Sequence, residues 1–429
     1  MIGAGAAGLI AARAAARGGK NVLVLEAARD AGRKILVSGG GRCNVLPMED
    51  APQRFVSESP NRLVRRFLDR WPLAEQREFF EELLGGPLRE EKESRKLFPP
   101  SNRAVDVRDA LRFAVAAAGA TLRPSAPVRD LVPVGDGFVI RLDAAGLEEI
   151  HAPRVILATG GLSVLAGGAD AAGYAWASAM GHKVHPTYPA LVPLVGNAPA
   201  HHALSGISLP ARVTARSGEG KDAESATSTG GFLFTHKGWS GPAILDVSHV
   251  VERAELAGRT AEVKICFGFG EEKISLKVPE RGVGGSLSGD VAARWDAALV
   301  GAPGSRSLSS FLSKSSVPDR LASLILDVAR VPDSRLSGLP RDERARVVAA
   351  VTAFPLPATG TEGYRTAEVT GGGVALEEVD AGSGRSKLVP GLYLAGEILD
   401  AFGPIGGFNF QWAWATGKTA GEAAARDEI

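Results

Sequence analysis

The chain opens with a glycine-rich fingerprint that restricts it to one kind of fold. Gly3, Gly5 and Gly8 follow the pattern Gly-x-Gly-x-x-Gly, and Glu26 lies 18 residues beyond Gly8. The first glycine permits a tight strand-to-helix turn, the second lets the backbone approach a pyrophosphate, and the third lets the helix pack closely on the sheet. A carboxylate at the end of the next strand, 21–25, can accept ribose hydroxyls. The fingerprint therefore predicts a βαβ unit that holds a dinucleotide at a helix N-terminus.

The composition narrows the partners that the chain can have. Lysine and arginine number 49 against 48 for aspartate and glutamate, so there is no overall basic field and we expect no nucleic-acid partner. No apolar run reaches the roughly 18 residues that span a bilayer, so we expect no membrane partner. Two distant cysteines, Cys43 and Cys266, make neither a disulfide framework nor a zinc pattern. We therefore expect a cytoplasmic protein without a metal, and the oligomeric state stays open.

The order of elements predicts an α/β fold that is interrupted by a segment of different texture. In the first part of the chain, some segments have apolar residues at helical spacing and others have the alternation of strands. Short strands with turns begin near residue 189. In the first part we expect helices at 8–18, 60–84 (two), 104–118 and 170–181, a hairpin at 128–134 with 138–142, and a strand at 155–158. Farther on we expect strands at 191–195, 211–216, 231–235, 261–267 and 273–278, a mobile loop at 217–229, helices within 290–352, and a last helix at 408–425.

A glycine fingerprint alone fits NAD or FAD, and three later segments favour FAD. Residues 158–161 follow a strand, 391–397 end another strand at Glu397, and 403–409 lead into the last helix. This ordered set resembles the two-dinucleotide-binding-domain flavoproteins of the glutathione-reductase type. The resemblance implies a carboxylate on the ribityl chain and a helix N-terminus aimed at the flavin pyrimidine. Because reduced flavin carries negative charge near N1, such a helix end would stabilise it by ~0.3–2 kcal/mol.

Longer motifs narrow the resemblance to one family. Residues 32–44 read Gly-Arg-Lys-Ile-Leu-Val-Ser-Gly-Gly-Gly-Arg-Cys-Asn. Further matching segments are 97–99, 188–194, 233–236, 240–245 and 396–414. Together they are similar to the aminoacetone-oxidase-like, NAD(P)/FAD-dependent oxidoreductase family of bacterial flavoproteins, over essentially the whole chain.

This resemblance implies the domain organisation. We expect an α/β fold with a Rossmann-like FAD-binding domain that contains a β-meander and is formed by residues 1–188 and 362–429. The inserted domain, 189–361, should be β-rich and β-barrel-like over 189–280 and mainly helical over 281–361. It should cover the open face of the flavin, so that substrate binds between the two.

The resemblance also implies an FAD-dependent enzyme that transfers a hydride between flavin N5 and a small organic substrate. Two directions stay open: oxidation of a small amine or amino-ketone with oxygen, or reduction of an unsaturated compound with NAD(P)H as a diffusing electron donor. A flavoprotein with a structural, sensing or RNA-modifying role is the alternative, and a basic surface patch would favour RNA. A module that binds only NAD fits less well, since it would not need the Gly396-Glu397 turn or the Gly406-Gly407 helix start.

The predicted cofactor contacts come from the fingerprint, the 32–44 motif and the later turns. They are Gly3, Gly5, Ala6, Ala7, Gly8, Glu26, Lys34, Ser38, Gly40, Gly41, Arg42, Cys43, Asn44, Val128, Thr159, Gly160, Gly161, Gly396, Glu397, Gly406, Gly407, Phe408 and Asn409.

The catalytic group is less clear from the sequence. His236, Tyr188 and Asn409 are candidates for contact with substrate, and packing roles are equally open to them. Cys43 has no second cysteine at a redox-motif spacing, which argues against disulfide-reductase chemistry. Lys34 and Arg42 could balance the charge of the pyrophosphate or of a substrate.

The chain departs from the family pattern in two places. Ser163-Val164-Leu165 replaces a Ser-Tyr-Pro-like stretch after the Thr-Gly-Gly turn. The strand before the fingerprint is only Met1-Ile2, where members of the family carry several more apolar residues. Losing about five residues of a central strand would leave unpaired groups costing ~1–3 kcal/mol each. We expect translation to begin upstream, a chain starting at Met1 to express poorly or without flavin, and an upstream extension to restore both.

Overall fold

The computed structural model describes residues 1–92, 94–143, 148–163, 171–268 and 287–427. The chain divides into two compact units, and each has its own hydrophobic core. Unit 1 comprises Met1–Pro189 and Tyr364–Ile429, and unit 2 comprises Ala190–Gly363. The roles assigned to the two domains from the sequence stay predictions.

The core of unit 1 is a largely parallel sheet around the start of the chain. Strand β1 (Leu23–Leu25) pairs in parallel with β5 (Thr121–Arg123), and β9 (Val155–Leu157) with β21 (Leu392–Leu394). Ile2 joins the two pairs, since it forms parallel bridges to Leu25 on one side and to Leu157 on the other. Strands β1, β9 and β21 are short and apolar, as expected where both faces of a parallel sheet are covered, whereas β5 carries the more exposed Thr121 and Arg123.

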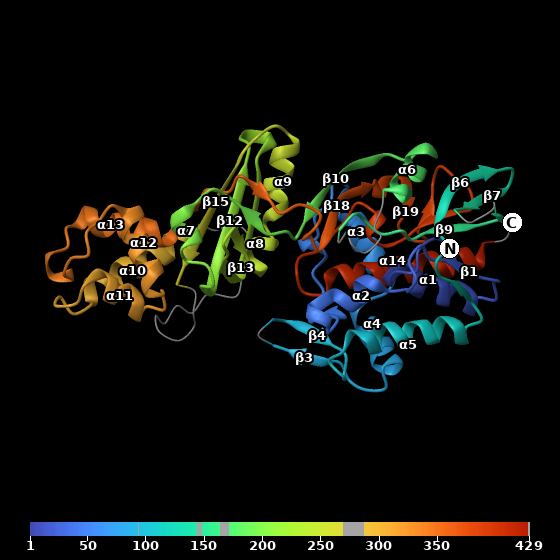
Figure 1. Cartoon of the computed structure of the whole chain (residues 1–429), viewed down its shortest axis with the longest axis horizontal. Coiled ribbons are helices and arrows are strands. Elements are labelled where there is room, and N and C mark those ends of the chain that lie inside the picture. Colours follow the sequence, from blue (N-terminus) through green and yellow to red (C-terminus); the bar gives the residue numbers. More distant parts are fainter. Residues whose placement is uncertain (93, 144–147, 164–170, 269–286, 428–429) are drawn as a thin grey trace. The chain divides into compact units, whose positions relative to one another are not determined.

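Two helices from opposite ends of the chain pack against each other in unit 1. Helix α1 (Ala6–Arg17) lies beside α14 (Phe408–Arg426), shown blue and red in Figure 1. Gly417 and Gly421 of α14 meet the backbone of α1, because a side chain at either position would overlap the carbonyl oxygen of Ala7 or Ala11. Close helix contact therefore needs glycine at these two positions.

The remaining elements of unit 1 surround this sheet. Its helices are α2 (Arg33–Val37), α3 (Asn61–Leu68), α4 (Leu73–Leu83), α5 (Ala104–Ala117) and α6 (Ala172–Ala179), with short 3-10 turns at Ser38–Gly41, Pro52–Arg54, Leu376–Glu378 and Gly396–Ile398. Strands β2 (Leu46–Pro47), β4 (Lys96–Phe98) and β3 (Arg89–Glu91) form a small sheet, and a meander consists of β6 (Val128–Val134), β7 (Gly137–Leu142) and β8 (Glu148–Ala152). Strand β10 (Val184–Ala190) pairs with β18 (Val369–Val374). Strands β20 (Arg385–Ser386) and β19 (Val379–Asp380) extend the central sheet beyond β21.

Unit 2 is a seven-stranded antiparallel sheet with helices. The strand order is β16-β15-β12-β13-β14-β11-β17, and helices α10 to α13 gather beside β15 and β16 (Figure 1). The strands are β11 (Leu194–Val195), β12 (Ser208–Ser217), β13 (Glu224–Phe234), β14 (Gly238–Ser240), β15 (Ala261–Phe267), β16 (Phe354–Leu356) and β17 (Gly360–Thr361). The helices are α7 (Pro199–His202), α8 (Pro242–Leu245), α9 (Ser248–Leu256), α10 (Leu287–Gly301), α11 (Leu308–Lys314), α12 (Asp319–Ala329) and α13 (Arg341–Thr352), with 3-10 turns at Gly220–Asp222 and Leu336–Gly338.

The predicted α/β fold class is confirmed, and one local prediction is wrong. The mobile loop at 217–229 is mostly strand, because β13 starts at Glu224 and pairs with β12 from Ser217 onward. The segment is rich in small polar residues, which suggested a loop, but Thr227 bonds across the strands to Thr214 at 3.0 Å. Threonine suits such cross-strand pairs, and the pairing partner was not visible locally. The strand expected at 273–278 lies outside the described residues.

Within the described residues, no helix combines the length and apolar character needed to cross a membrane. No group of three or more histidine, cysteine, aspartate or glutamate side chains in those same segments is placed to hold a metal ion.

A buried histidine makes unit 2 sensitive to acid. His201 is 7% exposed, and its ring lies 5.2 Å from the ring of Phe354 and 5.5 Å from that of Trp239. Its Nδ1 has no hydrogen-bond partner among the described residues. Burial, aided by the charge of His202, lowers the pKa of His201 to about 4. Below pH 6.5 His201 is therefore protonated in the unfolded chain, whereas in the folded chain it stays neutral down to about pH 4. The free energy of unfolding falls as the pH drops through this window.

We expect His201→Phe to flatten this acid dependence. Phenylalanine keeps the ring packing and has no titrating group. Between pH 7 and pH 5 the free energy of unfolding of the variant should therefore fall by less than that of the parent protein, the difference being roughly 2 kcal/mol. Urea unfolding, followed in unit 2 peptides by pulse-labelling hydrogen exchange, measures the difference. His249, whose pKa burial also lowers to about 4, is present in both proteins and keeps the background equal. Parallel pH profiles for the two proteins would contradict the expectation.

Candidate functional site: a cofactor cleft in unit 1

A cleft of about 750 Å³ lies in unit 1 at the carboxyl ends of the parallel strands. It is bordered by the turn into α1, the end of β1, helix α2, the turns after β9 and β21, and the first turn of α14. Ligands of open α/β sheets bind at this edge, where the order of the strands reverses. The parallel strands place residues from both ends of the chain around one cavity.

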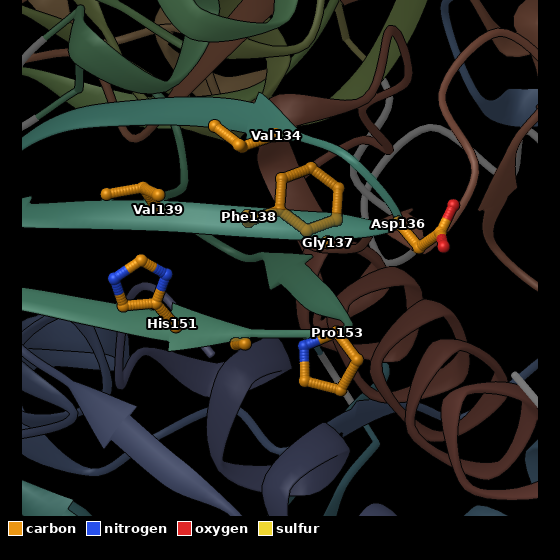
Figure 2. A pocket seen from close by; sticks show the side chains of 8 residues that line it. Val134, Asp136, Gly137, Phe138, Val139, His151 and Pro153 are labelled. Carbon is orange, nitrogen blue, oxygen red and sulfur yellow. The ribbon is translucent and has the colours of Figure 1, made fainter.

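A second hollow of about 370 Å³ lies on the meander (Figure 2). Its lining comprises Val134, Asp136, Gly137, Phe138, Val139, His151, Ala152 and Pro153. Asp136 and His151 come from different strands' ends and lie apart among the labelled side chains in Figure 2. We assign no chemistry to this hollow.

The three fingerprint glycines have different surroundings. Gly3 has a φ of 97°, and a side chain there would overlap the carbonyl oxygen of Ala158. A side chain at Gly8 would overlap the carbonyl oxygen of Gly3. In contrast, a methyl group at Gly5 would have no protein atom within 4 Å, and Gly5 lines the cleft. Gly3 and Gly8 therefore serve packing, whereas Gly5 leaves space on the cleft side of the helix N-terminus.

The carboxylate of Glu26 is fixed at the end of β1. Its Oε2 accepts a hydrogen bond from the backbone N–H of Ala4 at 2.8 Å, and its Oε1 accepts one from that of Ala28 at 2.9 Å. Each oxygen keeps a lone pair for a further donor. Since Glu26 also lines the cleft, its carboxylate can receive hydroxyl groups of a bound ribose.

A partly buried ion pair forms another part of the cleft wall. Lys34 Nζ lies 2.8 Å from Glu397 Oε2 and 2.8 Å from Ser163 Oγ. Burial of Glu397 raises the pKa of its carboxyl, but the charge of Lys34 and hydrogen bonds from Lys34, Thr370 and Ser163 lower the pKa overall. The Glu397 carboxylate is therefore ionised at neutral pH.

The start of α14 is held by two asparagines. In the amide orientation that satisfies both groups, Asn44 Oδ1 accepts from the Gly407 N–H at 2.9 Å and Nδ2 donates to the Leu46 carbonyl at 3.2 Å. Asn409 Oδ1 accepts from the Gly403 N–H, and its Nδ2 donates to the Gly403 carbonyl, both at 2.9 Å. These bonds fix the 403–407 turn against the loop that follows the 32–44 motif.

Most of the predicted contacts line the cleft. They are Gly3, Gly5, Ala6, Ala7, Glu26, Lys34, Ser38, Gly40, Asn44, Val128, Thr159, Gly160, Gly161, Gly396, Glu397, Gly406, Gly407 and Asn409. The structure brings this set together from segments that are distant in the sequence, and their role in binding stays a prediction.

Five predicted contacts lie outside the lining: Gly8, Gly41, Arg42, Cys43 and Phe408. Arg42 pairs with Glu91 at 2.9 Å and lies over the Phe98 ring. Cys43 is fully buried, and burial raises the pKa of its thiol to about 12, which leaves it unreactive at neutral pH. Phe408 is 3% exposed and packs edge-on against Phe55.

The catalytic candidates belong to different parts of the chain, Tyr188 and Asn409 to unit 1 and His236 to unit 2. Tyr188 is buried in unit 1, edge-on to Phe402 and against Gly371. His236 is exposed in the turn between β13 and β14 of unit 2. Asn409 lines the cleft, but its amide is engaged by Gly403, so it has a bracing role there.

Sequence reasoning missed the contribution of segment 366–370 to the cleft. Thr366 to Val369 line it, and the Thr370 N–H donates to Glu397 Oε1 at 2.9 Å. Thr370 Oγ1 also accepts from the Leu162 N–H at 2.7 Å. No motif marks these residues, because their role depends on neighbours that are distant in the sequence. Leu162, for example, lies 208 positions from Thr370.

The lining fits an FAD molecule. Gly5, Ala6 and Ala7 supply the N-terminal N–H groups of α1 for a pyrophosphate, and Glu26 supplies ribose contacts. Thr159, Gly160 and Gly161 bring the backbone of the turn after β9 into the same lining.

Comparison with protein families identifies this arrangement. Residues 1–423 match the model described as the HI0933-like protein Rossmann domain. The chain belongs to this family. It is 31% identical to the ribosomal RNA dihydrouridine synthase of Escherichia coli, over 97% of this chain and 95% of that protein. It is 32% identical to the 3-dehydro-bile acid delta(4,6)-reductase of Clostridium scindens, over 99% of this chain and 98% of that protein.

Solved structures of low identity share the fold. The 3-ketosteroid-delta4-(5alpha)-dehydrogenase of Rhodococcus jostii matches with a TM-score of 0.50 at 14% identity, covering 99% of this chain and 96% of that one. The HI0933-like family is one of FAD-dependent oxidoreductases, and the prediction of such an enzyme is confirmed at that level. The narrower resemblance to aminoacetone oxidases stays a prediction.

Two glycine substitutions should separate cofactor contact from folding. Gly5→Ala adds a methyl group that meets no protein atom at an ordinary φ of −77°, so the apoprotein should keep its stability within about 1 kcal/mol. We expect its FAD affinity to fall at least about tenfold, because the methyl group occupies the approach to the helix N-terminus. Gly8→Ala, which collides with Gly3, should instead lower the stability of the apoprotein itself.

Flavin absorbance after gel filtration and the apoprotein melting temperature measure the two effects. A Gly5→Ala protein that binds FAD as tightly as the parent would mean that the pyrophosphate does not lie at this turn.

Proposed function

We propose that this protein is an FAD-dependent reductase that saturates a carbon–carbon double bond conjugated to a carbonyl group. The supporting observation is the unit 1 cleft, in which the α1 N-terminus lies between the fixed carboxylate of Glu26 and the Lys34–Glu397 pair. FAD, when bound, supplies hydride chemistry that amino-acid side chains lack.

The relatives' names point to one type of bond. A dihydrouridine is a uridine whose C5–C6 double bond, conjugated to the C4 carbonyl, has been reduced. A 3-dehydro-bile acid with delta(4,6) double bonds carries them in conjugation with its 3-oxo group. Both relatives cover nearly the whole of this chain, and they act on molecules of very different size. We therefore propose that this protein also acts on an electron-poor double bond, the feature that the two named substrates share.

The reaction balances with a nicotinamide as the electron source. A hydride adds to the β carbon as the π bond breaks, and a proton adds to the α carbon, so that two electrons and two hydrogens enter the substrate. We propose that NAD(P)H reduces the flavin in a separate encounter, since the sequence shows no second dinucleotide fingerprint. Amine oxidation, the reverse use of the flavin, is the competing outcome of the test.

This chain's residues would bind and orient rather than form covalent bonds. The N–H groups at the start of α1 bind the pyrophosphate, and Glu26 binds the ribose. The start of α14, braced by Asn44 and Asn409, presents the positive end of a 19-residue helix to the cleft and favours negative charge there.

Anaerobic mixing distinguishes reductase from oxidase. We expect NADPH or NADH to bleach the flavin absorbance, and a conjugated enone, but not its saturated ketone, to restore it. Small amines and amino-ketones should leave the oxidised flavin unchanged. Bleaching by amines without bleaching by either nicotinamide would overturn the reductase assignment, and a colourless protein that takes up no FAD would overturn the cofactor assignment.

An RNA substrate is a second candidate, favoured by a patch on α3. Arg62, Arg65, Arg66 and, just beyond the helix, Arg70 are all exposed and recur at helical spacing on one face. Arg66 lies 3.7 Å from Asp380, and Asp69 shares the face, so the patch keeps a positive excess. The expectation that the protein has no nucleic-acid partner is thus reopened, since the relative from Escherichia coli carries ribosomal RNA in its name.

Charge reversal on α3 tests this candidate. We expect the parent protein to bind a ribosomal RNA fragment with a salt-dependent affinity, and Arg62→Glu with Arg65→Glu to weaken that binding at least about tenfold in low salt. The same charge change at Arg335 and Arg341, exposed in unit 2, is the matched control and should have less effect. Fluorescence anisotropy across a salt series measures both. Equal losses in the two double variants, or no binding by the parent, would rule the patch out as an RNA contact.

A further inference from the structure

Lys34 occupies a defined position in the cleft wall. Its Nζ donates to Glu397 Oε2 and to Ser163 Oγ, both at 2.8 Å. An ammonium has three N–H donors, so these two contacts leave one for a molecule in the cleft. The side chain of Lys34 is 37% exposed and that of Glu397 is 20% exposed. The ammonium is therefore the more accessible end of the pair.

Glu397 is enclosed by groups that hold it in place. Its Oε1 lies 2.9 Å from the Thr370 N–H and 3.1 Å from Ser163 Oγ. Removing the cation from a partly buried carboxylate leaves its charge uncompensated, so Glu397 and Lys34 depend on each other electrostatically. The network joins α2, the turn after β9, β18 and the turn after β21, and each of these segments contributes to the cleft lining.

The strand order places this pair on the flavin side of the cleft. Ile2, which leads into α1, lies between β1 and β9, and β21 lies beyond β9. Glu26 follows β1, and Glu397 follows β21, so the two carboxylates flank the phosphate-binding turn on opposite sides. A carboxylate after β1 contacts the adenosine ribose in this fold, which leaves the opposite side for the riboflavin half.

We propose that Lys34 and Glu397 act as opposed charges that set the reduction potential of the bound flavin. This inference rests on the proposed binding of FAD in the cleft and adds what the wall contributes to it. Reduction places negative charge on the flavin ring. A nearby ammonium stabilises that charge and raises the potential, whereas the carboxylate behind it opposes this effect.

A purely structural role predicts a different result. If the pair only held the four segments together, removing either member would loosen the cleft and weaken FAD binding without a consistent effect on flavin chemistry. Opposed charges predict that the two single substitutions shift the flavin in opposite directions. The sign of the shift therefore distinguishes the two roles.

The experiment compares Lys34→Met, Glu397→Gln and the double variant, each loaded with FAD at pH 8. The readouts are the midpoint potential against reference dyes and the dissociation constant of the flavin–sulfite adduct, which tightens as the flavin becomes more electron-poor. We expect Lys34→Met to weaken sulfite binding at least about tenfold and lower the potential, and Glu397→Gln to do the reverse. The double variant should lie between the singles, near the parent.

Two milder variants keep the test decisive if the single substitutions lose FAD. Lys34→Arg keeps the charge and should preserve the affinity for sulfite. Ser163→Ala removes one partner of the ammonium and should change the affinity for sulfite measurably. Shifts of both single variants in the same direction, or unchanged flavin chemistry in all FAD-loaded variants including Ser163→Ala, would overturn the proposal. Failure of the parent protein itself to bind FAD would instead count against the proposed function.

Discussion

The close approach of α1 to its neighbours is the constraint on which the cleft depends. On the sheet side, Gly3 accommodates the carbonyl of Ala158, and Gly8 accommodates that of Gly3. On the other side, Gly417 and Gly421 let α14 meet the backbone of α1. A helix held this tightly must present its N-terminal N–H groups at one fixed point of the sheet edge. The strand ends, the 403–407 turn and α2 are arranged around that point.

Charge is distributed around this point rather than concentrated on it. Glu26 is fixed by two backbone N–H groups on one side, and Glu397 is held with Lys34 and Ser163 on the other. In the role that we propose, a neutral pair whose ammonium is the more exposed member would favour a flavin that gains negative charge, and it would add little net charge to repel the cofactor's phosphates.

The local patterns that predicted correctly are those whose physical cause lies within a few residues. The turn into α1 needs glycine for steric reasons, and helices α3, α5 and α14 bury stripes of apolar residues at helical spacing. Segment 224–229 was misread as a loop, because its strand conformation comes from pairing with β12. Arg42 and Cys43 share the 32–44 motif with cleft residues but point elsewhere, since a motif gives proximity and not side-chain direction.

By itself, the sequence determined the dinucleotide-binding start, the α/β class, the family motifs and most of the segments that border the cleft, since each is written in short-range spacing. The tertiary structure alone decided which side chains share a wall. Lys34 meets Glu397 across 363 positions and Ser163 across 129, and Thr370 joins them from a segment without a motif. Such contacts depend on strand order and on burial. Both are properties of the whole packed unit, so no local stretch of sequence encodes them.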